Sequence, residues 1–251
     1  METMKPWVRN LIALFLNWRS RELVPHVFQA LSGGERAFSD IQRVRNMAHE
    51  SVPRPKVYYV GIGNIGSLNL DLLYPLLATD FSELTAVDMG PRQSGLFFDK
   101  FIQAVTLNLS LVDEINQEEI SFSMLSEDIF SAGFIYDGMS RRVNMHINFD
   151  ATASLPPELS RGYQVLFTRR TNALFAPGFI NAIPEETKNA MLSFLAPQGL
   201  AVFQELVGDE WDIQRRTGEL LRWLGDDFEV KFASADGEPS YDKIMCFGRK
   251  T

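Results

Sequence analysis

The chain has little of several features that mark whole classes of protein. It contains a single cysteine, Cys246, which excludes an intrachain disulfide and a cysteine-rich metal site. We therefore expect no bound metal and a reducing, cytoplasmic compartment. The chain also has no long basic run and a net charge of −8, so the usual electrostatic source of nonspecific nucleic-acid binding is missing. We expect no nucleic-acid partner.

Long apolar runs are also scarce. The run at residues 11–16 is flanked by Arg9, Asn17 and Arg19, whereas a membrane span needs about 20 apolar residues. No small-residue cleavage site follows this run, so it does not resemble a secretory signal. Its apolar side chains recur at helical spacing, which predicts a helix packed on the domain. We expect no membrane partner.

The sequence does contain enough apolar material for a large core, with 45% hydrophobic and 12% aromatic residues. Residues 1–52 show helical patterns, and we interpret them as a helical cap or lid. Pro53 and Pro55 end this region, and residues 53–251 then alternate strand-like and helix-like segments. This alternation predicts a doubly wound, mostly parallel sheet that is covered by helices on both faces.

Seven segments read as strands. They are residues 56–60, 83–87, 143–149, 163–168, 199–205, 228–234 and 242–249. The region at 89–142 is too long for one crossover helix. Because it holds a helical run (96–113) and a second apolar stretch (120–125), we interpret it as an insertion of helices near the binding face.

A glycine-rich turn follows the first predicted strand. Residues 56–60 are rich in β-formers and lead into Gly61-x-Gly63-x-x-Gly66, after which a helical apolar pattern begins. Glycine permits a tight turn and a close approach of the backbone to a ligand, and the N–H groups at the helix start face that ligand. The pattern predicts a nucleotide-binding unit.

An acidic residue follows the second predicted strand. Residues 83–87 end in Asp88, at the roughly 20-residue offset where an acid binds ribose hydroxyls in such units. Strand, glycines, helix, strand and terminal acid together predict a Rossmann-like ligand site.

Four segments, taken in order and spacing, resemble the class I S-adenosylmethionine-dependent methyltransferases: residues 61–66, 86–89, 147–156 and 194–203. The resemblance implies a Rossmann-like, seven-stranded sheet closed by an antiparallel C-terminal hairpin. It also implies S-adenosyl-L-methionine as the cofactor. The cofactor-binding residues that it suggests are Tyr59, Gly61, Gly63, Asn64, Asp88, Met89, Asp150, Ala151 and Thr168.

The chain departs from the family pattern at several positions. Tyr59 stands where the family usually carries an acid, and Ile65 stands where it usually carries the third glycine. These changes move the loop toward the dinucleotide-binding pattern. The acid that meets the adenine is either Asp128 or Asp150. We favour Asp150, since only 12 residues separate it from the strand that begins at Tyr163.

Methyl transfer from a sulfonium chiefly requires positioning and the exclusion of water, so no diagnostic catalytic motif is expected. None is present in the sequence. Two weak catalytic candidates remain. Arg169 follows the predicted strand at residues 163–168. Its guanidinium either holds a carboxylate of the cofactor or substrate at this strand end, or forms an ion pair on the protein surface. His146 lies in an apolar strand and is either a base or a core histidine.

The sequence thus favours an S-adenosylmethionine-dependent transferase that acts on a small molecule, most simply a methyltransferase. One alternative is a cyclase or aminoalkyl transferase that consumes the same cofactor and releases methylthioadenosine. Another is an NAD(P)-dependent oxidoreductase, and the last is a non-catalytic Rossmann-like partner subunit.

Overall fold

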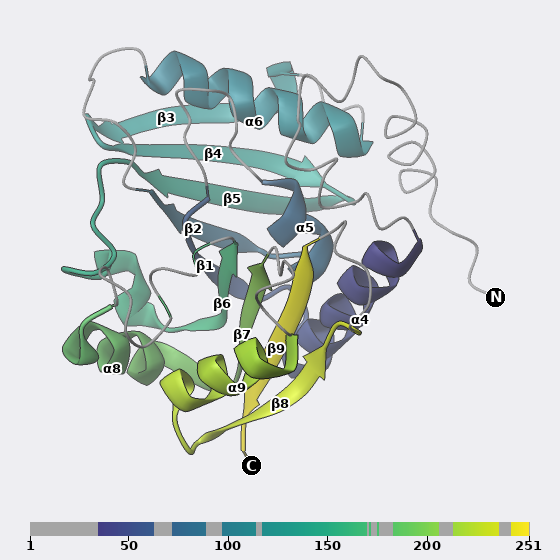
Figure 1. Ribbon diagram of the computed structural model, residues 1–251. Helices are drawn as coiled ribbons and strands as arrows, with labels where there is room; N and C mark the ends of the chain where they lie inside the picture. The colour runs from purple at the N-terminus through teal and green to yellow at the C-terminus, as the bar shows by residue number, and fades with distance from the viewer. Residues whose placement is uncertain are drawn as a thin grey trace.

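The computed structural model describes residues 35–62, 72–88, 97–113, 117–169, 171, 175, 183–205, 213–235 and 242–250. These residues form a nine-stranded sheet in the order β3-β4-β5-β2-β1-β6-β7-β9-β8 (Figure 1). The strands are β1 (Lys56–Val60), β2 (Glu83–Val87), β3 (Ser121–Ser126), β4 (Ile129–Tyr136), β5 (Met139–His146), β6 (Tyr163–Arg169), β7 (Leu195–Glu205), β8 (Phe228–Ala233) and β9 (Lys243–Arg249).

The middle of the sheet is parallel. β5, β2, β1, β6 and β7 lie side by side and run in one direction. In both β1 and β2 every residue after the first is buried. Such unbroken apolar strands are typical of a parallel sheet with both faces covered. The predicted α/β class is confirmed, as are the predicted strands at residues 56–60 and 83–87.

The two ends of the sheet are antiparallel. β9 pairs antiparallel with both β7 and β8, which is the C-terminal hairpin that the resemblance implies. At the opposite end, β3, β4 and β5 form an antiparallel meander. The described sheet is therefore mixed, with two more strands than the seven predicted.

The prediction of helices throughout residues 89–142 is wrong in its second half. The helical run is present as α6 (Phe97–Asp113), but residues 121–136 form β3 and β4. In β4 every second side chain from Phe130 to Tyr136 is buried, as expected for a strand. Asp137 and Gly138 join β4 to β5 with φ of 51° and 70°, which suits the two-residue hairpin turn that Asp-Gly favours.

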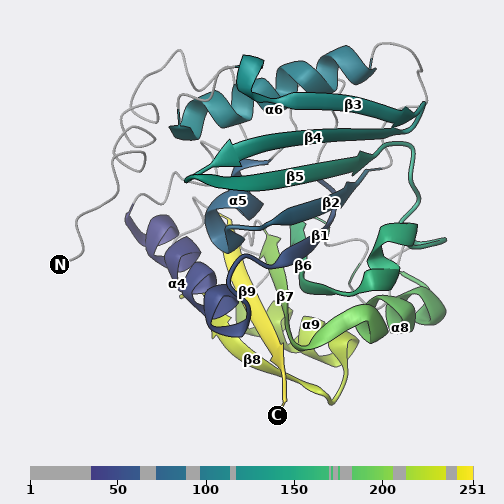
Figure 2. The same cartoon turned by 180° about the vertical axis from the view of Figure 1, so that it is seen from behind.

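Helices cover both faces of the sheet. α4 (Glu35–Ser51) and α5 (Leu73–Thr79) pack on one face together with α6. The opposite face carries the 3₁₀ turn η3 (Pro157–Arg161), α8 (Glu185–Phe194) and α9 (Ile213–Leu224). A further 3₁₀ turn, η2 (Gln117–Glu119), precedes β3. α9 lies in front of the sheet in Figure 1 and behind it in Figure 2, whereas α4 does the reverse.

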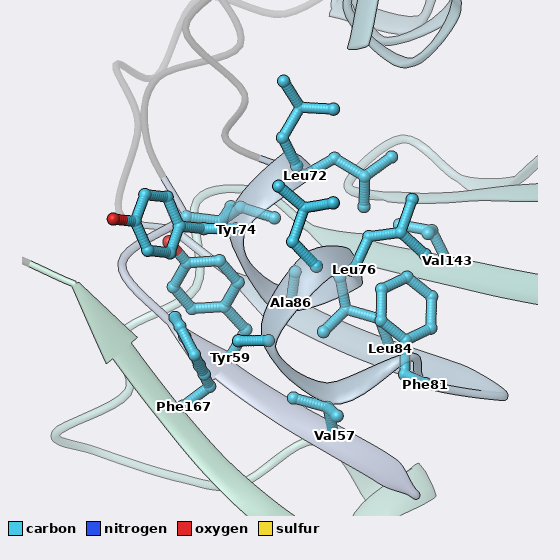
Figure 3. Close-up of a cluster of buried hydrophobic side chains, with 14 of the residues drawn as sticks. Val57, Tyr59, Leu72, Tyr74, Leu76, Phe81, Leu84, Ala86, Val143 and Phe167 are labelled. Carbon is cyan, nitrogen blue, oxygen red and sulfur yellow. The ribbon is translucent and has the colours of Figure 1, made fainter. Parts of the chain in front are cut away.

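The larger core lies between the sheet and α4, α5 and α6. Figure 3 shows Tyr59 and Phe167 from neighbouring strands packed beneath Tyr74 and Leu76 of α5. α4 adds Ile41, Val44 and Ala48, all essentially inaccessible to solvent.

Within the region 1–52 that was predicted to be helical, residues 35–51 form α4, and this helix belongs to a core layer. Residues 1–34 lie outside the described residues, so the division into a cap (1–52) and a domain (53–251) stays a prediction. None of the described helices has the length and apolar character needed to cross a membrane.

Candidate ligand site at the carboxyl ends of the strands

Three parallel strands end together at one edge of the sheet. Backbone hydrogen bonds continue past the strands and tie their ends to one another. The Gly61 N–H donates to the Val87 carbonyl (3.0 Å), and the Asp88 N–H donates to the His146 carbonyl (3.1 Å). The Phe149 N–H in turn donates to the Asp88 carbonyl (3.1 Å). Residues that are far apart in sequence thus lie side by side where open α/β sheets bind ligands.

A pocket of about 150 Å³ opens at this edge. Its described lining is almost entirely apolar, and Asp88 and Thr152 are the polar residues among those that contribute to it. The lining residues are Val60, Gly61, Val87, Asp88, Phe149, Ala151 and Thr152. Ligand sites commonly occupy about 300–1,000 Å³. The described pocket would therefore hold one part of a nucleotide-sized molecule.

Gly61 has two structural reasons to lack a side chain. Its φ is +77°, in the left-handed region that L-residues avoid. A Cβ atom at this position would also lie 2.4 Å from Cγ2 of Thr171. The first glycine is thus required by the turn and by contact with the end of β6, apart from any ligand.

The structure brings three of the predicted cofactor residues together, since Gly61, Asp88 and Ala151 all line the pocket. Gly63, Asn64 and Met89 lie outside the described residues, so their predicted roles stay predictions.

Asp150 lies on an exposed turn beside the pocket and is not among the lining residues. Its Oδ1 accepts hydrogen bonds from the Thr152 N–H (2.9 Å) and the Thr152 hydroxyl (2.6 Å). These two bonds hold the pKa of the Asp150 carboxyl below its usual range. The carboxylate thereby closes a local turn, and its predicted contact with adenine stays a prediction.

The side chains of Tyr59 and Thr168 point to opposite faces of the sheet. Tyr59 is fully buried in the larger core, where its ring meets Phe167 edge-on at 5.1 Å, so this side chain does not line the pocket. Thr168 pairs with Val60 at the end of β6 and is also fully buried. The Thr168 hydroxyl has no hydrogen-bond partner among the residues that the structure describes. Because buried polar groups are nearly always paired, this hydroxyl is a candidate contact for a bound molecule.

Arg169, a predicted catalytic candidate, is neither on the surface nor in the pocket lining. Its Nε donates to Oδ2 of Asp242 at 3.1 Å, and both side chains are almost fully buried. Its guanidinium also lies 5.0 Å from the ring centre of Tyr74. The alternative of an ion pair at the surface is therefore wrong in its location, because the pair is buried. This geometry indicates a structural ion pair.

A second buried ion pair lies nearby on α9 and β7. Nε and Nη2 of Arg216 donate to the two carboxylate oxygens of Glu205 at 2.5 and 2.6 Å. Burial raises the pKa of the Glu205 carboxyl, and Arg216 acts in the opposite direction. Together with Arg169–Asp242, this pair places two buried ion pairs near the ends of β6, β7 and β9.

His146 is the last residue of β5 and is buried. Its Nε2 lies 3.4 Å from Oε2 of Glu158, and its ring meets Phe149 edge-on at 5.7 Å. Burial lowers the pKa of the imidazole, and Glu158 opposes this shift. His146 thus sits behind the pocket wall rather than in the lining. Its position suits packing of the wall better than contact with a reacting atom.

Four lining residues, Val60, Val87, Phe149 and Thr152, were not predicted as site residues. Val60 ends the predicted strand 56–60, and the other three lie inside the 86–89 and 147–156 segments on which the family resemblance rests, so the signal was present in the sequence. Asp128, the alternative acid, lies in the β3–β4 turn and is not in the lining.

No family model matches the chain, and no curated protein matches it in sequence. Among solved structures, it is similar to the N-methyltransferase NodS from Bradyrhizobium japonicum at 10% identity and a TM-score of 0.43, over 86% of this chain and 99% of that one. It is similar to MtNAS in complex with MTA and tNA at 9% identity and a TM-score of 0.42, over 99% and 71% of the two chains. It is also similar to the citrinin polyketide synthase CMeT domain at 10% identity and a TM-score of 0.46, over 95% and 59%.

All three TM-scores are below 0.5. The fold class follows from the chain's own strand order. Five parallel strands, helices on both faces and an antiparallel closing hairpin make a Rossmann-like α/β fold with a mixed sheet.

Proposed function

We propose that the chain is an S-adenosylmethionine-dependent transferase that acts on a small molecule, most simply by methyl transfer. One observation carries the proposal. β9 lies between β7 and β8 and is antiparallel to both, and β2 of the same sheet is followed directly by Asp88, which lines the pocket. This is the sheet that the resemblance to the class I methyltransferases implies.

The strand order speaks against a dinucleotide-dependent oxidoreductase. The dinucleotide-binding fold orders its strands 3-2-1-4-5-6, with the sixth strand next to the fifth. In this chain the corresponding run is β5-β2-β1-β6-β7, and the antiparallel β9 then separates β8 from β7. The literal glycine pattern of the turn is thus outweighed by the arrangement of the C-terminal strands.

The described pocket fits the nucleoside part of the cofactor. Val60, Val87 and Phe149 offer an apolar surface on which a purine ring can pack. The carboxylate of Asp88 can accept hydrogen bonds from ribose hydroxyls. The unpaired Thr168 hydroxyl lies one strand further along the edge, beside Val60. These residues would hold the cofactor, which supplies a methyl group already activated on a positive sulfur.

We propose a small, uncharged or cationic acceptor. The net charge of −8 disfavours a polyanion, because a nucleic acid would be repelled by the chain's overall field. Among the described lining residues, none is a histidine or lysine that could act as a strong base. The reaction would then depend on positioning and on the exclusion of water.

Calorimetric titration with S-adenosylhomocysteine, S-adenosylmethionine and NAD(P) tests the proposal. We expect S-adenosylhomocysteine to bind and NAD(P) not to bind. Binding of NAD(P) alone would overturn the assignment, and failure of every nucleotide to bind would favour a non-catalytic subunit. Product analysis then separates methyl transfer, which leaves S-adenosylhomocysteine, from attack on the aminoalkyl arm, which releases methylthioadenosine.

A further inference from the structure

The β3–β4 hairpin reaches the same edge of the sheet as the pocket. β4 runs antiparallel to β5, so the first residue of β4, Ile129, pairs with the last residue of β5, His146. The turn that joins β3 to β4, residues 127 and 128, therefore lies beside the segment that leaves β5. That segment carries Phe149, Ala151 and Thr152 of the pocket wall.

Asp128 holds this segment by two hydrogen bonds. Its backbone carbonyl accepts the N–H of Ile147 at 2.9 Å. Its Oδ1 accepts from Nδ2 of Asn148 at 2.8 Å. One residue of the hairpin turn thus fixes both the backbone and a side chain at the point where the wall begins.

The conformation of Asn148 makes this bond important. Asn148 has φ of +53°, in the left-handed region that asparagine tolerates better than most residues. This turn of the chain leads directly into Phe149, whose N–H pairs with Asp88. At the other end of the wall, the Thr187 hydroxyl donates to the Thr152 carbonyl at 2.9 Å. The wall is therefore held by Asp128 where it begins, by Asp88 at Phe149 and by Thr187 at Thr152.

We propose that Asp128 is a positioning residue for the bound nucleoside. It keeps Asn148 left-handed and so places Phe149, Ala151 and Thr152 against the ligand, without touching the ligand itself. The β3–β4 hairpin, which lies outside the parallel part of the sheet, thereby holds one side of the pocket in place. The identity of the ligand rests on the proposed function, but the support of the wall does not.

Asp128→Ala removes the side-chain bond at an exposed position and should leave the fold intact. Loss of such a bond is expected to weaken binding of S-adenosylhomocysteine roughly fivefold in calorimetry, with an unchanged melting temperature. Glu127→Gln is the matched control, because Glu127 is an exposed neighbour in the same turn and loses the same charge. This control should bind like the wild type.

An exchanged pair tests the geometry directly. Asn148→Asp alone brings two carboxylates together and should weaken binding at least as much as Asp128→Ala. The double variant Asp128→Asn/Asn148→Asp restores a donor and an acceptor and should recover most of the lost affinity. A double variant no better than Asn148→Asp alone would overturn the proposal, as would wild-type affinity in Asp128→Ala.

Hydrogen exchange of the free protein provides a readout that needs no ligand. In Asp128→Ala the amides of residues 147–153 should exchange faster than in the wild type and in Glu127→Gln. If the wild type fails to bind S-adenosylhomocysteine, the proposed function fails, and this measurement alone decides the role of Asp128. Unchanged exchange in residues 147–153 would then overturn it.

Discussion

The carboxyl edge of the sheet has two ends with opposite chemistry. At the β1–β2–β5 end, the described residues around the pocket are mostly apolar, and Asp88 is the acidic residue among them. At the β6–β7–β9 end, the interior is filled by two ion pairs, Arg169–Asp242 and Arg216–Glu205. A charged residue at the end of a strand can thus lie either in the lining of a pocket or in a buried ion pair. Its partners in space, rather than its place in the sequence, decide which.

The largest effect that we predict is at the ion-paired end. Arg216→Met leaves Glu205 buried without its bidentate partner, so the free energy of unfolding should fall by about 3–5 kcal/mol. Urea denaturation measures this loss. Arg215→Met, at an exposed position on the same helix, is the control and should cost less than about 1 kcal/mol. If both variants lose equally little free energy of unfolding, the ion pair does not stabilise the β6–β7–β9 end, and the contrast with the pocket end fails.

At the pocket end, the largest effect should appear in binding. Asp88→Ala removes the acceptor for ribose hydroxyls, so S-adenosylhomocysteine should bind at least tenfold more weakly, or about 1.5–3 kcal/mol. The melting temperature should change little. Asp137→Asn, in the β4–β5 turn, removes a carboxylate at the opposite edge, keeps a residue that tolerates the left-handed φ of +51°, and should bind normally. Unchanged calorimetric affinity in Asp88→Ala would mean that Asp88 merely ends its strand.

Gly61→Ala tests whether the pocket turn is rigid. The new methyl group meets Cγ2 of Thr171 and keeps a left-handed φ, whereas Gly138→Ala keeps a left-handed φ of +70° with nothing within 4 Å. Both variants should be strained, and Gly61→Ala should lose about 1–2 kcal/mol more in urea denaturation. Thr171→Ser in the Gly61→Ala background should recover part of that difference. Equal losses at the two glycines would mean that Thr171 simply moves aside.

The smallest effect concerns pH. Burial depresses the pKa of His146 in the folded state below the reference value of 6.5, so the folded chain binds fewer protons than the unfolded chain as the pH falls. Stability should therefore be fully present above pH 6.5 and decline as the pH falls below it. His146→Gln should flatten this decline in urea denaturation measured between about pH 7 and pH 5. An identical slope in both proteins would contradict the assignment.

Much of the fold could be predicted because its central strands are unbroken apolar runs that end in turn residues. β1, β2 and β6 lie almost where the pattern predicts them. The β3–β4 hairpin was missed because β3 is an edge strand whose residues are almost all exposed, so Ser121–Ser126 carries no buried apolar face that would mark it as a strand. The Asp137-Gly138 turn was the usable cue, since this dipeptide strongly favours a tight hairpin.

The site was harder to predict than the fold. Asp88 and Gly61 could be placed because strand ends and glycine turns are local features of the sequence. Arg169 could not, because its partner Asp242 is distant in sequence and no short-range pattern joins them. The role of Asp128 was likewise hidden, since it depends on a hairpin that brings the residue beside Asn148.

The paired guanidinium and carboxylate of Arg216 and Glu205 also bear on how the chain responds to heat. Removing charged groups from water becomes less costly as temperature rises, because their hydration carries a strongly negative entropy. The β6–β7–β9 end should therefore gain relative stability on warming. The wall at residues 148–152 is held by exposed hydrogen bonds, so it does not gain stability from a falling cost of burying charge. Gentle heating should loosen the pocket while the ion-paired end of the sheet remains folded.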